Sequence, residues 1–208
     1  MVPEDQQARL DGDVAPMQRH DISWLLERRS VAVKRLGPPA PSEEEFQQIL
    51  SAALAAPDHG ALRPWRLVLC PGESRERLAE LFVTAKLKIH PGATEVELAR
   101  EREKALRPPV LLALIAASKR GQTKVPEIEQ IASAGAALQS ILLAAHGLGY
   151  GAIMLSGSRC VAENVRDALE VKSGEHLLGF ISIGTIVETP RLASRPTLSD
   201  VLRTFDGS

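Results

Sequence analysis

Residues 56–65, Ala-Pro-Asp-His-Gly-Ala-Leu-Arg-Pro-Trp, form a polar loop bounded by two prolines. Because proline fixes φ, Pro57 and Pro64 hold the side chains between them in place. About thirty residues before the loop stands the triplet Arg-Arg-Ser at 28–30, whose guanidinium and hydroxyl groups match phosphate oxygens. A rigid polar loop and an anion-binding triplet together favour a bound cofactor that contains a phosphate.

The loop is expected to connect a helix to a strand. Ser42 and Glu45 have the spacing of a capping box, and apolar residues follow at helical intervals up to Leu54. A strand is predicted just beyond the loop, over 66–70. The pattern as a whole indicates an α+β fold rather than a regular βαβ alternation. The other expected helices cover 21–29, 75–89, 94–106, 126–146 and 162–169, and the other expected strands cover 110–116, 152–155 and 176–185.

Length and charge limit the number of domains and the classes of partner that the chain can have. A chain of 208 residues has room for one substantial core, so we expect a flexible tail over 1–20, without a secretion-signal pattern, and a single domain over 21–208. Its 25 basic and 26 acidic residues create no global field that would attract nucleic acid or an anionic membrane. Cys70 and Cys160 lack the spacing of a disulfide or metal motif, which favours structural packing in a reduced, cytoplasmic setting. No metal site is predicted.

The segment 131–149 is nearly long and apolar enough to cross a bilayer. Gln139, Ser140 and His146 interrupt it. A helix that is apolar on most sides is also what the centre of a compact dimer requires, and we expect this second arrangement.

Residues 147–157, at the end of that helix, contain glycines at positions 147, 149, 151 and 157. They do not form a Gly-x-Gly-x-x-Gly motif between a strand and a helix, so a Rossmann domain is not expected. By themselves they are typical of a helix end followed by a turn.

Together these blocks resemble the FMN-dependent nitroreductase family, and in particular its short single-domain branch. The resemblance runs from about residue 21 to the C-terminus. It implies a central, mostly antiparallel sheet flanked by helices, with the long helix at the interface of a homodimer. The blocks that carry it are Arg-Arg-Ser, the Pro-Ser helix start at 41–42, the loop at 56–65, Lys124-Val125-Pro126, the glycine segment at 147–157, and residues 179–185.

The resemblance also implies where FMN binds. The first arginine and the serine of the triplet hold the phosphate and ribityl chain, a C-terminal arginine adds a second phosphate contact, and the loop histidine lies against the ring bound by the second subunit. Without the resemblance, the arginines are typical of solvated cations and the histidine of a loop residue bonded to its own backbone. The implied FMN-binding residues are Arg28, Arg29, Ser30, His59, Leu155, Ser156, Gly157 and Arg195.

Several positions depart from the family's pattern. Ala61 stands where an asparagine is common and Arg63 where a glutamine is common, while Ile128 and Met154 replace tryptophans. Ala61 and Arg63 would not supply the family's usual polar contacts from this loop, and His59 is the natural substitute. A flavin can pack its faces on aliphatic groups, so the missing tryptophans indicate an altered acceptor pocket rather than a lost cofactor. Lys34 would place positive charge near the pyrimidine edge of the ring.

The implied activity is oxidoreduction. FMN accepts a hydride from NADH or NADPH and passes two electrons to a small acceptor, such as a nitroaromatic or a quinone, by a ping-pong mechanism. No catalytic side chain is assigned, and His59 or solvent would supply a proton. The alternatives are another flavin reaction on the same fold (ene reduction, reductive dehalogenation or flavin breakdown) and non-catalytic binding of a flavin or small ligand. No motif encodes the acceptor or the choice between NADH and NADPH.

Overall fold

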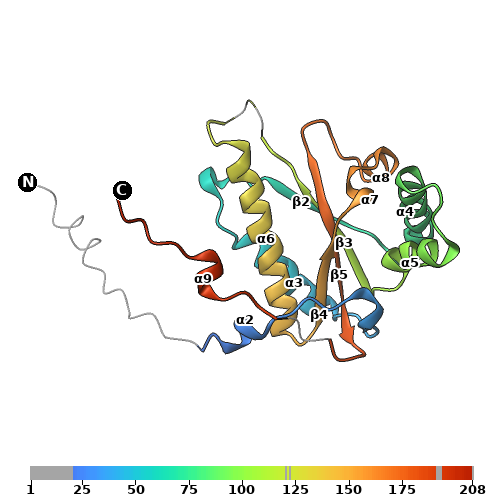
Figure 1. Ribbon diagram of the computed structural model, residues 1–208, viewed down its shortest axis with the longest axis horizontal. Coiled ribbons are helices and arrows are strands. Elements are labelled where there is room, and N and C mark those ends of the chain that lie inside the picture. Colours follow the sequence, from blue (N-terminus) through green and yellow to red (C-terminus); the bar gives the residue numbers. More distant parts are fainter. Residues whose placement is uncertain (1–20, 120, 122, 191–193, 208) are drawn as a thin grey trace, which may run out of the picture.

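The computed structural model describes residues 21–119, 121, 123–190 and 194–207, so the tail predicted over 1–20 lies outside the described residues. Within the described chain, five strands form one sheet in the order β1-β5-β3-β2, with β4 also paired to β5 (Figure 1). Every pairing between these strands is antiparallel, which confirms the predicted sheet. The strands are β1 (Leu36–Gly37), β2 (Trp65–Leu69), β3 (Val110–Ala116), β4 (Gly151–Leu155) and β5 (His176–Ile186).

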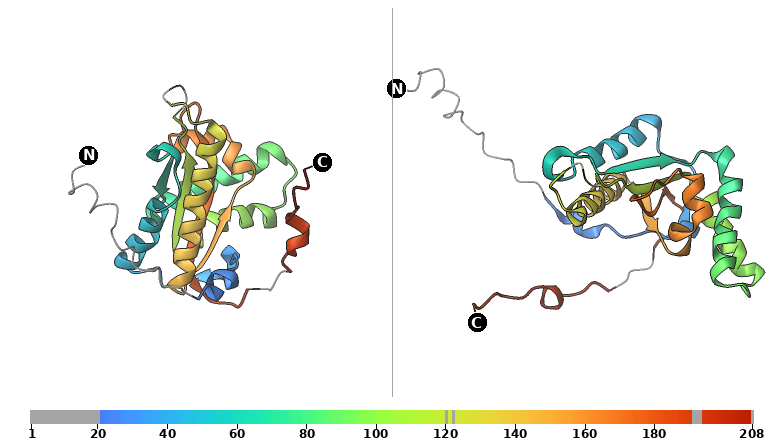
Figure 2. Two further views of the ribbon diagram at one scale, coloured as in Figure 1. Left: turned by 90° about the vertical axis from the view of Figure 1, so that its left-hand side faces the viewer. Right: turned by 90° about the horizontal axis from the view of Figure 1, so that it is seen from above.

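Helices cover both faces of the sheet (Figures 1 and 2). Two of them, α3 (Glu43–Leu54) and α6 (Glu127–Gly147), lie on one face. On the other face α4 (Arg75–Ile89) carries α5 (Glu95–Leu106) on its outer side. The short helices α7 (Ser158–Val161) and α8 (Glu163–Ala168) complete that layer, whereas α2 (Ser23–Glu27) and α9 (Leu198–Val201) flank the body of the molecule.

The two helical layers explain why β3 is apolar along its whole length. Successive side chains of a strand point to opposite faces, so a strand covered on both sides needs no polar positions. On one face β3 packs with Phe82 of α4 and Phe180 of β5, whose ring centroids lie 4.8 Å apart. On the other it packs with Ile49 of α3 and Ile141 of α6. The β3 residues that alternate between these two cores are Leu111, Ala113 and Ile115 on the first and Val110, Leu112 and Leu114 on the second.

Helix α3 begins where the sequence predicts. The Ser42 hydroxyl accepts a hydrogen bond from the Glu45 amide at 3.2 Å, and the Ser42 amide donates to the Glu45 carboxylate at 2.8 Å. The Tyr150 hydroxyl also donates to Glu45, at 2.8 Å, and so ties α3 to the turn after α6. The loop at 56–65 therefore leaves a helix that is fixed at its start and packed along one side.

Helix α6 is buried on one side only. Its inner residues, including Ala137 and Ile141, are fully buried, whereas Ile128 is 72% exposed at its first turn. Among the described helices it is the one that is long and apolar enough, by length and composition, to cross a membrane. Its inner side is packed on α3 and the sheet, as the prediction of a core helix requires, and its outer side is uncovered in the single chain.

Some elements differ from the prediction. The helix expected over 162–169 is α8, which begins after the extended Ala162, and the short helix α7 before it was not predicted. The helix expected over 21–29 is shorter, since Arg28 leaves the helical region with ψ at 130°. Strand β1 and helix α9 were not predicted, because two and four residues are too few for a periodic pattern.

Candidate functional site

The chain after α2 runs alongside β4. Ser30 forms a parallel bridge with Ala152, and the Val31 amide donates to the Ala152 carbonyl at 3.1 Å. Glycine is required at Gly151, because a Cβ there would lie 2.7 Å from Leu36 and 2.8 Å from Ile186. The missing side chain at Gly151 thus lets the triplet at 28–30 lie directly beside the sheet.

The structure brings four of the predicted residues together. Arg28, Arg29, Ser30 and Arg195 line one cavity of about 430 Å³. Arg195 donates from Nη2 to the backbone carbonyl of Arg28 at 2.9 Å, which joins the C-terminal segment to the triplet. The remaining lining residues are Leu25, Gln139 and Ser194.

Several hydrogen-bond donors in this cavity have no partner within the part of the chain that the structure describes. Among the described residues, none bonds the Arg28 guanidinium or the Ser30 hydroxyl. Arg29 donates from Nη1 to the carbonyls of Leu26 and Arg28, at 3.1 and 3.2 Å, while its Nε is buried without a partner. No carboxylate is among the described residues that line the cavity. Three guanidinium groups and a hydroxyl with unused donors form a set that fits a phosphate.

Strand β4 leads from this cavity to the other predicted cofactor segment. Leu155 lies three residues beyond Ala152, about 10 Å along the strand. Ser156 and Gly157 follow it and are exposed, and Gly157 has a left-handed φ of 99°. A phosphate joined to a ring system by a five-carbon chain can bridge this separation.

His59 lies in a different part of the chain. Its Nδ1 is 2.7 Å from Oε2 of Glu129, in the first turn of α6. Gln139, which lines the arginine cavity, stands ten residues further along α6, about 15 Å away. One chain therefore does not bring His59 to its own arginine cavity. Glu129 was not singled out from the sequence, where no pattern links it to His59.

The loop that carries His59 is held by more than its prolines. The Asp58 carboxylate accepts a hydrogen bond from the Arg63 amide at 2.6 Å. Gly60, Ala61 and Arg63 all have φ in the left-handed region, at 76°, 50° and 48°. Ala61 is unusual there, because its Cβ makes that conformation costly. The loop is thus a strained, preorganised turn.

Comparison with known proteins identifies the family. Residues 25–185 match the Nitroreductase family. The chain belongs to the nitroreductase family. A relative by sequence is YdjA of Escherichia coli (strain K12), a candidate NAD(P)H nitroreductase by its name, which is 34% identical over 164 residues, 79% of this chain and 87% of that protein.

Solved structures share the fold. A nitroreductase-like family protein from Bacillus cereus superimposes with a TM-score of 0.73 at 22% identity, covering 93% of this chain and 100% of that one. A candidate nitroreductase from Desulfovibrio desulfuricans, solved in complex with FMN, superimposes with a TM-score of 0.66 at 22% identity, covering 90% of this chain and 98% of that one. The predicted family and fold are confirmed.

In this nitroreductase family member, Lys34 and Arg35 differ in role. Lys34 is exposed and lines a neighbouring cavity of about 280 Å³ that shares Ser30 with the arginine cavity. Arg35 is buried and pairs with Glu188 at 2.9 Å, and it also donates to the Thr189 carbonyl. Arg35 therefore anchors the segment that follows β5. No local pattern indicates this role, because burial of an arginine follows from the tertiary fold.

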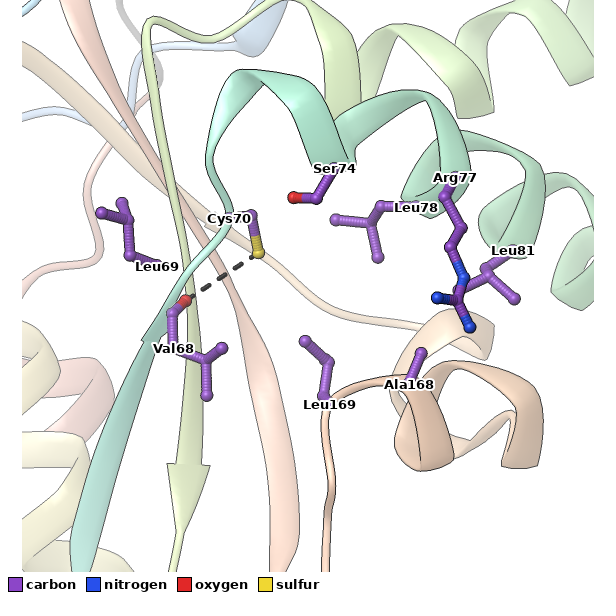
Figure 3. Close-up of a pocket in the computed structure, with 9 residues that line it drawn as sticks. All are labelled: Val68, Leu69, Cys70, Ser74, Arg77, Leu78, Leu81, Ala168 and Leu169. Atoms are coloured by element: carbon purple, nitrogen blue, oxygen red, sulfur yellow. Dashed lines mark hydrogen bonds between the residues drawn. The ribbon is translucent and has the colours of Figure 1, made fainter.

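A further cavity, of about 200 Å³, lies between the end of β2, α4 and α8 (Figure 3). Its walls are mostly aliphatic, and Cys70 lines it. Burial raises the pKa of the Cys70 thiol and of the Cys160 thiol, which leaves both as thiols rather than nucleophilic thiolates. Both cysteines are free and buried, as the sequence predicts for structural residues.

Proposed function

We propose that this protein is an FMN-dependent oxidoreductase that uses NADH or NADPH to reduce a small acceptor, such as a quinone or a nitroaromatic, by a ping-pong mechanism. One observation carries the proposal: Arg28, Ser30 and Arg195 converge on one cavity beside β4, in a chain of the nitroreductase family. The names of relatives such as YdjA and the FMN complex of the Desulfovibrio protein support it.

In this proposal the arginine cavity holds the FMN phosphate. Arg28 and Ser30 offer unused donors, Arg195 closes the cavity, and Arg29 contributes positive charge from behind. The ring would lie toward Leu155, Ser156 and Gly157, where the exposed end of β4 leaves room for it. When bound, FMN would supply hydride transfer, while these residues bind and orient it. No metal is part of the proposal.

We also propose that the working unit is a homodimer. The uncovered face of α6 carries Ile128, Ala132, Gly135 and Gln139, which share one side of the helix. A Cβ at Gly135 would meet no atom within 4 Å, so this side is open and closely approachable. A second α6 helix packed there would bury an apolar surface that a lone chain leaves in water.

Two antiparallel α6 helices that cross between Ala132 and Gly135 would bring the two parts of the site together. In that arrangement Glu129 of one copy lies about level with Gln139 of the partner subunit. His59 would then approach the partner's arginine cavity. A dimer of this kind accounts for the distance between His59 and Arg28 within one chain. Nucleic acid and membrane have no place in this proposal, and the protein would act in the cytoplasm.

The test is spectroscopic. The purified protein should carry a noncovalent flavin, and NADH or NADPH added without air should bleach its visible absorbance. Adding a quinone should restore the absorbance, and initial rates at several concentrations of both substrates should give parallel double-reciprocal lines. A protein without flavin, or one whose flavin neither nicotinamide reduces, would contradict the proposal.

A further inference from the structure

We propose that Glu129 positions His59 as the proton donor to the electron acceptor, in a site completed by a second copy of the chain. The inference rests on the proposed function and goes beyond it, since it assigns a specific source of the proton. Its basis is the 2.7 Å contact between Nδ1 of His59 and Oε2 of Glu129. Among the described residues, none bonds Nε2 of His59.

The backbone that carries each residue of the His59–Glu129 pair is held in place. His59 opens the strained turn His59–Ala61, which the Asp58 bond to the Arg63 amide closes. Glu129 lies in the first turn of α6, where the helix dipole favours a carboxylate. The imidazole ring is thus oriented by its Nδ1 atom, and its Nε2 atom is directed away from its partner carboxylate. Both side chains remain accessible, at 68% and 46% exposure, so the donor can reach an acceptor and exchange protons with water.

In the dimer proposed above, Nε2 of His59 would approach the acceptor bound in the site of the partner subunit. With α6 crossing its copy between Ala132 and Gly135, the His59–Glu129 pair lies near the partner's arginine cavity rather than its own. The acceptor must sit against the ring of the cofactor bound there. The donor and the cofactor would then come from different copies, which accounts for the separation of His59 from Arg28 within one chain.

The chemistry balances with one proton. Reduction of a quinone to a hydroquinone consumes one hydride, taken from the reduced cofactor, and one proton. The N–H bond at Nε2 of the His59 imidazolium breaks and an O–H bond forms on the acceptor, which leaves a neutral imidazole. Glu129 accepts a hydrogen bond from the Nδ1–H group throughout. The neutral ring therefore keeps its proton on Nδ1, and Nε2 carries a proton only when the ring is charged. Solvent then restores the imidazolium.

The chain offers a matched control. His176 and Glu127 form a second histidine–glutamate pair, at 2.9 Å, and Glu127 lies two residues before Glu129 in the same first turn of α6. The charged groups on the elements around His59 are Asp58 and Arg63 on its own loop, Glu127 and Glu129 on α6, and Lys124 just before it. Replacing Glu127 or Glu129 by glutamine removes the same charge from this group, but only the Glu129 change removes the partner of His59.

The experiment compares Glu129→Gln with Glu127→Gln in the flavin-loaded dimer, with His59→Gln as a second variant. Stopped-flow absorbance measures reduction of the flavin by NADH or NADPH and its reoxidation by a quinone. We expect Glu129→Gln to slow reoxidation by about tenfold and His59→Gln by about a hundredfold, the scale of general-acid catalysis. Reduction of the flavin should be slowed much less than its reoxidation in both.

A measurement without turnover checks the pair directly. In the flavin-free protein, the ¹⁵N chemical shifts of the neutral His59 ring should report a proton held on Nδ1 in the parent and shared between Nδ1 and Nε2 in Glu129→Gln, because the partner that orients the ring is changed. The shifts should stay as in the parent in Glu127→Gln.

The outcomes separate this inference from the proposed function. A parent protein that binds no flavin, or whose flavin no nicotinamide reduces, overturns both. A parent that turns over while Glu129→Gln and Glu127→Gln reoxidise at equal rates overturns the role of Glu129 alone, as does an equal slowing of both half-reactions.

Discussion

Arg195 donates a hydrogen bond from Nη2 to the backbone carbonyl oxygen of Arg28 at 2.9 Å, across 167 residues of sequence. The bond joins the segment after β5 to the turn after α2, and the two arginines then face the same cavity. Because the bond uses one of the three nitrogens of the Arg195 guanidinium, the other two can donate to an anion. The cavity is therefore built from both ends of the described chain.

Removing the Arg28 guanidinium should weaken FMN binding. A charge-assisted hydrogen bond to phosphate contributes about 1.5 to 3 kcal/mol, so Arg28→Ala should raise the Kd for FMN roughly tenfold or more. Quenching of flavin fluorescence on titration measures the Kd. Arg77→Ala, which removes an exposed arginine from α4, is the control and should leave the Kd unchanged. Equal affinities of Arg28→Ala and the parent would show that the phosphate binds elsewhere.

A charge on the outer face of α6 should separate the dimer without unfolding the chain. In Gly135→Glu the new side chain enters open space, and glutamate is a better helix former than glycine by about 0.5 kcal/mol. Light scattering at micromolar concentration should report a monomer with native circular dichroism and little flavin. Leu142→Glu is the contrasting variant, because Leu142 is buried in the core and the variant should unfold. A dimeric Gly135→Glu protein that keeps its flavin would contradict the proposed interface.

Asparagine at residue 61 should stabilise the protein. Ala61 has φ at 50°, a conformation that asparagine tolerates better than alanine, so Ala61→Asn should raise the free energy of unfolding by about 0.5 to 1 kcal/mol. Urea denaturation measures the change. The same substitution within α3, Ala52→Asn, should lower the free energy of unfolding, because asparagine is a poorer helix former than alanine. If both variants lose stability, the turn is not strained at Ala61.

The buried carboxylate of Glu101 should make stability depend on acidity. Burial by itself raises the pKa of Glu101, but the hydrogen bond from Lys104 and the charge of Arg159 outweigh it and hold the pKa below its usual range. The resulting stabilisation is complete above the unfolded-state pKa of about 4.3 and is lost as the pH falls through the lower folded-state pKa. Urea unfolding at neutral pH and across this acidic range should show the loss.

Two glutamine variants check the assignment to Glu101. Glu101→Gln should lower the free energy of unfolding at neutral pH by about 3 kcal/mol, because Arg159, 2.8 Å away, is left buried and unpaired. Its stability should also fall less on acidification than that of the parent. Glu103→Gln, on the exposed side of the same helix, should change the free energy of unfolding by less than about 0.5 kcal/mol. Parallel acid profiles of the parent and Glu101→Gln would assign the acid sensitivity to other groups.

Local signals in the sequence were enough to predict most of the elements. Helix α4 and strand β3 have the predicted bounds, and α3 begins at the predicted capping box. These signals work because caps and periodic apolar residues act over a few neighbouring positions. Helix α7 was missed because four residues are too few for a periodic pattern.

Some residues of the candidate site could also be predicted from the sequence, and others could not. The arginines and the serine were recognised by residue type and order, and the fold places them around one cavity. Glu129 and Arg35 were missed, because an ion pair between residues 70 positions apart and the burial of a charged side chain leave no local pattern.

The sequence alone was enough to identify the family and the α+β class, and to select residues whose side chains suit a phosphate. These properties depend on residue type and on spacing over a few positions, which can be read directly from the sequence. Only the tertiary structure decided which of those residues meet. The bridge from Ser30 to Ala152 and the bond from Arg195 to Arg28 exist because the chain after α2 lies beside β4 and the segment that holds Arg195 passes Arg28. The same packing separates His59 from that cavity and pairs it with Glu129, because the rigid length of α6 lies between the two.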